Sequence, residues 1–277
     1  MNSNTASRTP LRLAGFGHVA FALTLIALGI LGLIKGDFDA TWSPLPKNVP
    51  AREVLAYLCA LIYLLSGIGL LWRRTAAVAS RVLFAFLLAW LLLLRVPQVF
   101  LLHPTLLAAW GFGKTAVMVA AAWVLYVWFA DGKGLRLARA LYGVALIPFG
   151  LAHFVYLKET VVLVPHWLGS SVFWAYFTGA AFIVAGLAIL IGVYARLAAV
   201  LSLFQLAMFA LLVWLPRVVA GHLTAFQQGE VVVQVALTAA AWVVADSYRG
   251  APWLAVGPPA GRAAEAARSI EATAELR

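Results

Sequence analysis

The sequence contains a single cysteine, Cys59, and few charged residues. One cysteine can form neither an internal disulfide nor a Cys-x-x-Cys redox pair, so the chain has no dithiol chemistry of its own. Charged residues make up 11% of the 277 positions, against roughly 25% in a soluble domain. This shortage excludes an ordinary soluble globular protein, and 64% of the residues are hydrophobic instead.

Long apolar runs follow one another along almost the whole chain. A helix needs about 20 mostly apolar residues to cross the hydrocarbon, because every backbone polar group must be satisfied within the segment. Eight runs meet this requirement, at residues 13–34, 53–72, 76–94, 106–130, 137–157, 172–194, 197–215 and 230–248. The sequence therefore predicts an all-α, polytopic membrane protein. The N-terminus lacks the features of a cleavable signal peptide, so we expect the first span to be retained.

The second half of the sequence repeats the first at a fixed offset of 119 residues. Leu, Ala and Val match by chance in membrane helices, whereas matched proline, histidine, tyrosine and tryptophan residues are rarer. The matches of this rarer kind are Pro46 with Pro165, Tyr57 with Tyr176, Pro97 with Pro216, His103 with His222 and Trp123 with Trp242. We therefore expect a tandem duplication of one four-helix unit. Because four is an even number, the two repeats should run parallel, both starting on the same side of the membrane.

The duplication and the loops divide the chain into five predicted parts. These are a cytoplasmic N-terminal segment (1–12), a first membrane repeat (13–130), a cytoplasmic linker (131–139), a second membrane repeat (140–249) and a disordered cytoplasmic tail (250–277). With the N-terminus inside, nine Lys and Arg residues fall in inner segments and six in outer loops, and the inner loops are the shorter ones. Cytoplasmic loops carry the excess of Lys and Arg. We therefore predict that the protein lies in a bacterial-type inner membrane, with both termini in the cytoplasm.

The net charge of +10 follows from this topology and from contact with anionic membrane lipid, so it requires no nucleic acid as a partner. Two charges lie within or close to predicted spans. Lys114 lies about two turns inside the fourth span, where we expect it to pair with Glu53 or to extend its ammonium to the outer boundary. Glu230, at the start of the eighth span, is expected to pair with Arg217.

Several short segments of the second half form a recognisable pattern. They are FGLAHF (149–154), PHW (165–167), WAYFTGAAFIVAGLAILIG (174–192), ARLAA (195–199) and PR (216–217). Residues 140–245 resemble the DoxX family of small four-helix membrane proteins. The first half resembles it less, since Lys35 stands where the second half has His153. The resemblance implies association with membrane redox systems, because one named member is the small subunit of a thiosulfate:quinone oxidoreductase.

Polar residues gather at the outer mouth of the second repeat. A quinone-type ligand needs an apolar cleft at one membrane face, with a few hydrogen-bonding groups around a ring carbonyl. The candidate ligand-binding residues there are His153, His166, Trp167, Tyr176, Arg217 and His222. The alternative is a polar rim that satisfies the loop backbone and anchors tryptophan at the interface. Four histidines lie at the outer boundary, yet no H-x-x-x-H or similar spacing indicates a metal site, so we predict none.

Two classes of function agree with these features. The first is a membrane subunit of a redox system that binds a quinone-like ligand, the only cofactor indicated, and docks a partner oxidoreductase. The second is a carrier or scaffold for a lipid or small solute. An independent enzyme is the weakest option, because no nucleophile–base pair, metal cluster or nucleotide loop is present, and whether the chain takes part in catalysis stays open. Where the second half has His153, His166 and Arg217, the first has Lys35, Lys47 and Gln98, so we expect the ligand site in the second half.

Overall fold

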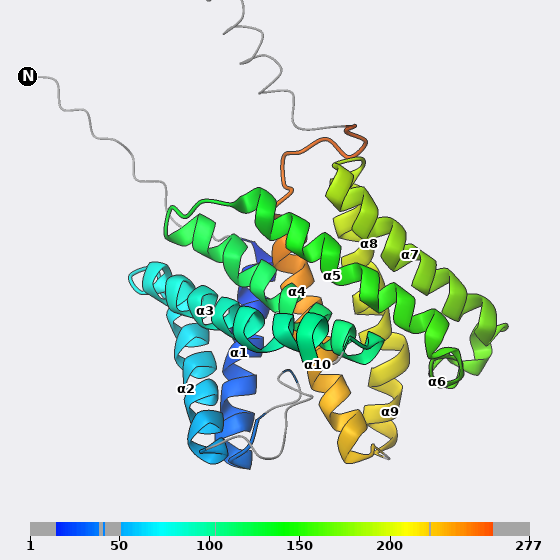
Figure 1. Ribbon diagram of the computed structural model, residues 1–277, viewed down its shortest axis with the longest axis horizontal. Helices are drawn as coiled ribbons and strands as arrows, with labels where there is room; N and C mark the ends of the chain where they lie inside the picture. Colours follow the sequence, from blue (N-terminus) through cyan, green and yellow to red (C-terminus); the bar gives the residue numbers. More distant parts are fainter. Residues whose placement is uncertain (1–14, 39–40, 42–50, 103, 222, 257–277) are drawn as a thin grey trace, which may run out of the picture.

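The computed structural model describes residues 15–38, 41, 51–102, 104–221 and 223–256 (Figure 1). In these ranges eight helical segments are long and apolar enough to cross a membrane, with mean hydropathies between 1.4 and 2.3. The spans are α1 (Phe16–Lys35), α2 (Arg52–Leu71), α3 (Ala76–Trp90) continued by η2 (Leu91–Arg95) and η3 (Gln98–Leu102), α4 (Leu106–Phe129), α5 (Leu135–Val155), α7 (Ser171–Ile191), α8 (Ala195–Met208) continued by η5 (Phe209–Trp214) and α9 (Leu215–Ala220), and α10 (Ala225–Asp246). Each predicted span overlaps one of them, and the all-α, multi-pass membrane class is confirmed.

Large apolar side chains on the outer faces of these spans are exposed, among them Leu93, Phe100 and Val184. Within a bilayer such faces meet lipid tails, because the backbone polar groups are already satisfied inside each helix. Lipid is therefore a contact of this chain along most of its surface. We call the side on which α1 ends the outer side, after the predicted orientation, which stays a prediction.

The helices of the two halves begin in matching register. α1 begins at Phe16 and α5 at Leu135, and the same 119-residue offset separates the starts of α2 and α7, of α3 and α8, and of α4 and α10. Both third spans also change from α-helix to π-helix, at Leu91 in η2 and at Phe209 in η5, one residue short of the 119-residue offset. A duplication predicts this agreement. The superposition of one half on the other about an axis along the membrane normal stays a prediction.

Small residues bring the first two helices of each half into close contact. A Cβ atom on Gly67 of α2 would lie 2.7 Å from the backbone oxygen of Ala22 in α1. In the second half, a Cβ atom on Gly186 of α7 would lie 2.6 Å from the backbone oxygen of Gly143 in α5. Contacts of this length leave no room for a side chain, as is usual where membrane helices pack backbone against backbone. The 119-residue offset also pairs Gly67 with Gly186.

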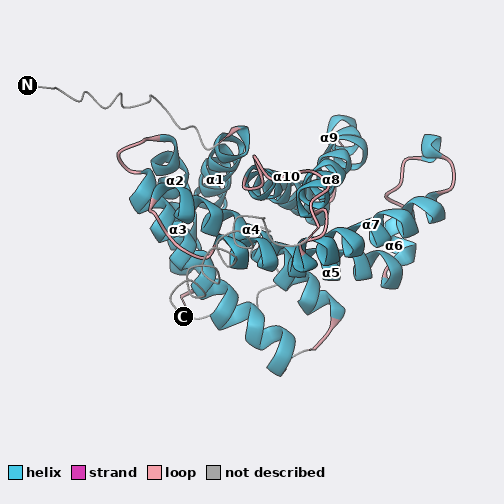
Figure 2. Ribbon diagram, turned by 90° about the horizontal axis from the view of Figure 1, so that it is seen from above, coloured by secondary structure: helices cyan, strands magenta, loops and turns pink. Residues whose placement is uncertain are grey.

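The fourth helix of each half lies in the middle of the molecule (Figures 1 and 2). α4 packs against α3 of its own half but also against α5 and α10, and α10 packs against α8, α1 and α4. We expected two bundles of four, whereas α4 and α10 each pack on the first helix of the other half. Residues 116–122 of α4 are all buried and mostly alanine or valine, so this helix can be covered on every side.

Residues after α10 fold back across the inner ends of the second half. The Arg196 guanidinium donates to the carbonyl oxygen of Ala251 at 2.6 Å and lies over the ring of Trp253 at 4.0 Å. The backbone N–H of Tyr194 donates to the carbonyl oxygen of Ala255. We predicted a disordered tail from residue 250 onward. Residues 250–256 instead contact the membrane domain through these bonds. The remainder, 257–277, lies outside the described residues.

Candidate functional site

His153 of the predicted ligand site lies in the last turn of α5, between aromatic rings. Its ring centroid is 5.7 Å from that of Phe182 in α7 and 5.8 Å from that of Phe209 in η5. Its Nδ1 lies 2.7 Å from the carbonyl oxygen of Phe149. A carbonyl oxygen only accepts, so Nδ1 carries the proton and Nε2 is left as the acceptor of a neutral ring. His153 therefore joins three helices and keeps one acceptor atom.

The guanidinium of Arg217 donates hydrogen bonds to backbone carbonyl oxygens. It donates to the carbonyl oxygens of Val213 at 2.7 Å, of Val162 at 3.1 Å and of Leu163 at 3.4 Å. These bonds tie α9 to the segment that follows α6 (Leu157–Val161). The contacts match the alternative of a polar rim that satisfies the loop backbone.

Three other predicted residues, His166, Trp167 and Tyr176, belong to other elements of the second half. His166 and Trp167 are in the short η4 (His166–Leu168), where both are exposed, and the ring of Tyr176 in α7 stacks on Phe154 of α5. His222 lies outside the described residues. None of these side chains lines either of the two grooves described below. The outer-mouth ligand site thus stays a prediction.

A groove of about 310 Å³ lies deeper in the second half, between η5 and α9 on one side and α10 on the other. We call it the α9–α10 groove, and its lining includes Leu211, Trp214, Val218, Val231, Gln234 and Val235. Trp214 is 9% exposed, and among the described residues its indole N–H makes no hydrogen bond. Gln234 donates its amide nitrogen to the carbonyl oxygen of Leu206 at 2.7 Å, which holds the side chain in place. Trp214 and Gln234 are thus the two lining residues with polar side-chain groups in an otherwise aliphatic groove.

The same positions in the first half are occupied differently. The 119-residue offset pairs Trp214 with Arg95 and Gln234 with Thr115. Arg95 is 1% exposed, and its Nε donates to Oγ1 of Thr115 at 3.2 Å. One of its terminal nitrogens donates to Oε1 of Gln98 at 3.0 Å. A hydrogen bond thus joins the two positions in the first half, whereas in the second half both line a groove.

An ion pair within the membrane connects the two halves near this groove. Nζ of Lys114 in α4 lies 3.3 Å from a carboxylate oxygen of Glu230 in α10, and the two side chains are 4% and 15% exposed. The ammonium also lies 4.0 Å from the centre of the Trp110 ring. Glu230 precedes Gln234 by four residues, so both side chains are on one face of α10. The expected partners, Glu53 for Lys114 and Arg217 for Glu230, are replaced by this pair.

The third span was predicted to end at residue 94, which left Arg95 outside it. Arg95 instead lies in η2, inside the third span, because that span continues to Leu102. The 119-residue offset already paired Arg95 with Trp214, so a comparison of polar positions at that offset was the signal available. That comparison could not show which of the two positions in each pair would line a groove, because this depends on how the helices pack.

Fold and site together define an eight-span helical membrane protein with an amphipathic groove. Among the described residues there is no group of three His, Cys, Asp or Glu side chains able to hold a metal ion. Comparisons with models of protein families, with curated proteins and with solved structures found no match.

Proposed function

We propose that this chain is a membrane-embedded subunit of a redox system. It binds a quinone-like molecule in the α9–α10 groove and docks a partner oxidoreductase, which carries the redox centre. The observation that supports this most is the pairing of Trp214 and Gln234 in an otherwise aliphatic groove inside the bilayer. The DoxX resemblance of residues 140–245 supports the redox association, and the groove lies in that half.

The chemistry of the groove suits a planar ring with carbonyl groups. Trp214 offers a flat aromatic face and a donor-only N–H, which a ring carbonyl can accept. The amide of Gln234 supplies a second polar contact, fixed by its bond to Leu206. Aliphatic side chains such as Leu211 and Val218 surround the rest of the ring. A few convergent polar groups in an apolar cleft are what orients a small ligand.

A carrier or scaffold for a lipid or small solute is the second candidate. The aliphatic lining of the groove favours it, since an acyl chain needs no polar partner. Redox difference spectra of the purified protein separate the two, because bound quinone supports the redox subunit. Solute-dependent flux in reconstituted vesicles, without bound quinone, supports the carrier.

The test is quinone retention by the chain purified in mild detergent. We expect quinone in the extract, and we expect Trp214→Phe and Gln234→Leu each to lower its affinity roughly three- to tenfold. Each change removes one hydrogen-bonding group, and a neutral hydrogen bond contributes about 0.5–1.5 kcal/mol. Trp72→Phe and Gln228→Leu are matched controls, because both side chains are exposed and neither lines a groove.

Retention unchanged in Trp214→Phe and Gln234→Leu would place the ligand elsewhere. An unmodified protein that neither carries quinone nor binds an added quinone would overturn the proposal.

A further inference from the structure

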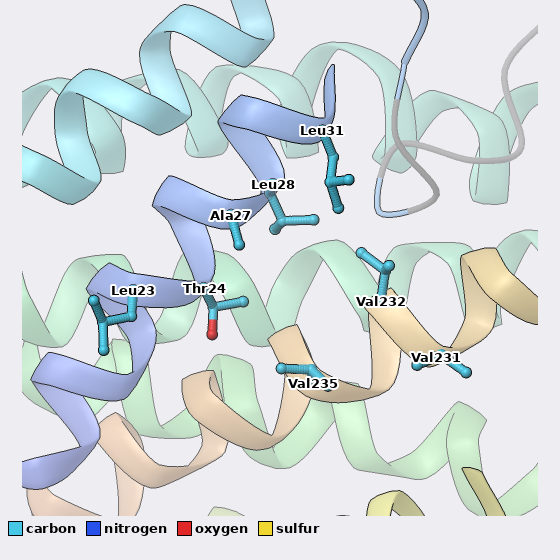
Figure 3. A pocket seen from close by; sticks show the side chains of 8 residues that line it. All are labelled: Leu23, Thr24, Ala27, Leu28, Leu31, Val231, Val232 and Val235. Atoms are coloured by element: carbon cyan, nitrogen blue, oxygen red, sulfur yellow. The ribbon is translucent and has the colours of Figure 1, made fainter. Parts of the chain in front are cut away.

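A second apolar groove runs along the other side of α10. This α1–α10 groove, also about 310 Å³, is formed by one face of α1 and one face of α10. Figure 3 shows Ala27 and Leu28 of α1 opposite Val232 and Val235 of α10, with the side chains directed into the space between the helices. The single hydroxyl in the lining, that of Thr24, donates to the backbone oxygen of Ala20 at 2.8 Å. The lining therefore offers no free hydrogen-bond donor.

The two grooves meet on α10. Val231 and Val235 line both of them, and these residues are one turn apart on the helix. They form a low ridge with the α9–α10 groove on one side and the α1–α10 groove on the other. An apolar chain can cross this ridge without meeting a polar group, because the shared side chains are both valine.

We propose that the ligand of the α9–α10 groove is a long-chain amphiphile. Its ring lies against Trp214 and Gln234, and its tail crosses Val231 and Val235 into the α1–α10 groove. The inference rests on the proposed function and narrows the ligand class to polyprenyl-tailed rings. The α1 side of the groove extends from Leu23 to Leu31, or about 12 Å at a rise of 1.5 Å per residue. That length holds a segment of an extended hydrocarbon tail.

The polar groups beside the ridge, at a depth that headgroups do not reach, favour this occupant over an acyl chain of a bulk phospholipid. A phospholipid headgroup stays at the membrane surface, whereas Val231 and Val235 lie about 9 and 15 Å beyond the first residue of α10. The polar contacts nearest the ridge are within the membrane, at Gln234 and Trp214. A molecule whose polar part is a ring at this depth fits both grooves at once.

The experiment fills the tail groove and leaves the ring groove intact. Ala27 is exposed in the α1–α10 groove, so Ala27→Phe occupies the space without disturbing the core. The matched control is Ile30→Phe, since Ile30 is an exposed residue of α1 outside the lining. Two probes are titrated into the protein in nanodiscs. One is a benzoquinone with a single isoprene unit, and the other has the same ring with a long polyprenyl tail.

We expect Ala27→Phe to weaken binding of the long-tailed probe roughly tenfold, which corresponds to losing the burial of about two methylenes. Binding of the short probe should stay within about twofold, and Ile30→Phe should change neither. Equal affinities of the two probes, with Ala27→Phe affecting neither, would overturn the tail proposal and leave the ring site standing. Loss of a co-purifying phospholipid in Ala27→Phe, with quinone binding unchanged, would overturn it in favour of a lipid chain. If neither probe binds the unmodified protein, the proposed function itself fails.

Discussion

The two halves of the molecule share a helical frame and differ in what stands at matching positions. In the first half, Arg95 and Thr115 are joined by a hydrogen bond across the interface between the third span and α4. In the second half, Trp214 and Gln234 occupy those positions and line a groove instead. The two halves share their helix starts and a change from α-helix to π-helix within the third span. Two side-chain differences decide whether matching positions bond to each other or face a groove.

The outer mouths differ in a similar way. The offset pairs Tyr63 with Phe182. The hydroxyl of Tyr63 lies 3.4 Å from the hydroxyl of Thr41, a residue of the loop after α1. In the second half, Phe182 contacts the ring of His153, which belongs to a helix. The matching positions therefore contact a loop residue, Thr41, in the first half and a helical residue, His153, in the second.

The largest expected effect concerns the ion pair that joins the halves. Lys114→Met alone should lower the free energy of unfolding by about 3–5 kcal/mol, because it leaves the Glu230 carboxylate without its partner inside the membrane. The double variant Lys114→Met, Glu230→Leu should recover most of this loss, since neither charge remains. Thermal stability in one detergent measures both. A double variant as unstable as the single one would show that the pair is not what connects α4 to α10.

A substitution of Arg217 distinguishes a ligand site at the outer mouth from a ligand site in the α9–α10 groove. If the ligand site is at the outer mouth, Arg217→Ala should lower quinone retention and Gln98→Ala, its first-half counterpart, should not. If the site is the α9–α10 groove, Arg217→Ala should cost stability by about 1–2 kcal/mol through lost bonds to the carbonyl oxygens of Val162 and Leu163 and leave retention near normal. Parallel measurements of retention and melting temperature separate the two outcomes. Equal losses of retention in both variants would contradict the functional asymmetry between the halves.

Reporter fusions test the orientation of the two halves in the membrane, and we expect them to change the protein least. A reporter active only in the cytoplasm should work after residue 277 and in the linker 131–139, and it should be silent within residues 36–50. Both halves then start on the cytoplasmic side, as parallel repeats require. Activity of the fusion within 36–50 would reverse the orientation and, with it, the side from which the outer mouth is reached.

The sequence was sufficient to predict the spans, because the length of an apolar run is a local property. It did not predict that α4 and α10 would pack across the halves, since that depends on which faces meet in space. For the same reason the partner of Lys114 was assigned to Glu53, which is nearer in the chain, rather than to Glu230. Trp214 and Gln234 become a candidate site only when η5 and α10 are placed side by side. The polar groups themselves were visible in the sequence, whereas their convergence was not.

The packing of α1 on α10 also has a consequence during synthesis. Of the eight described spans, α1 leaves the ribosome first and α10 last, with about two hundred residues between them. At roughly 5–20 residues per second, that interval lasts on the order of 10–40 s. During it, Gly17 lacks the Asp246 carboxylate that later accepts its backbone N–H at 3.2 Å, and the α10-facing side of α1 is uncovered. The membrane domain therefore closes from its two ends, and its assembly is complete only when the last helix reaches the first.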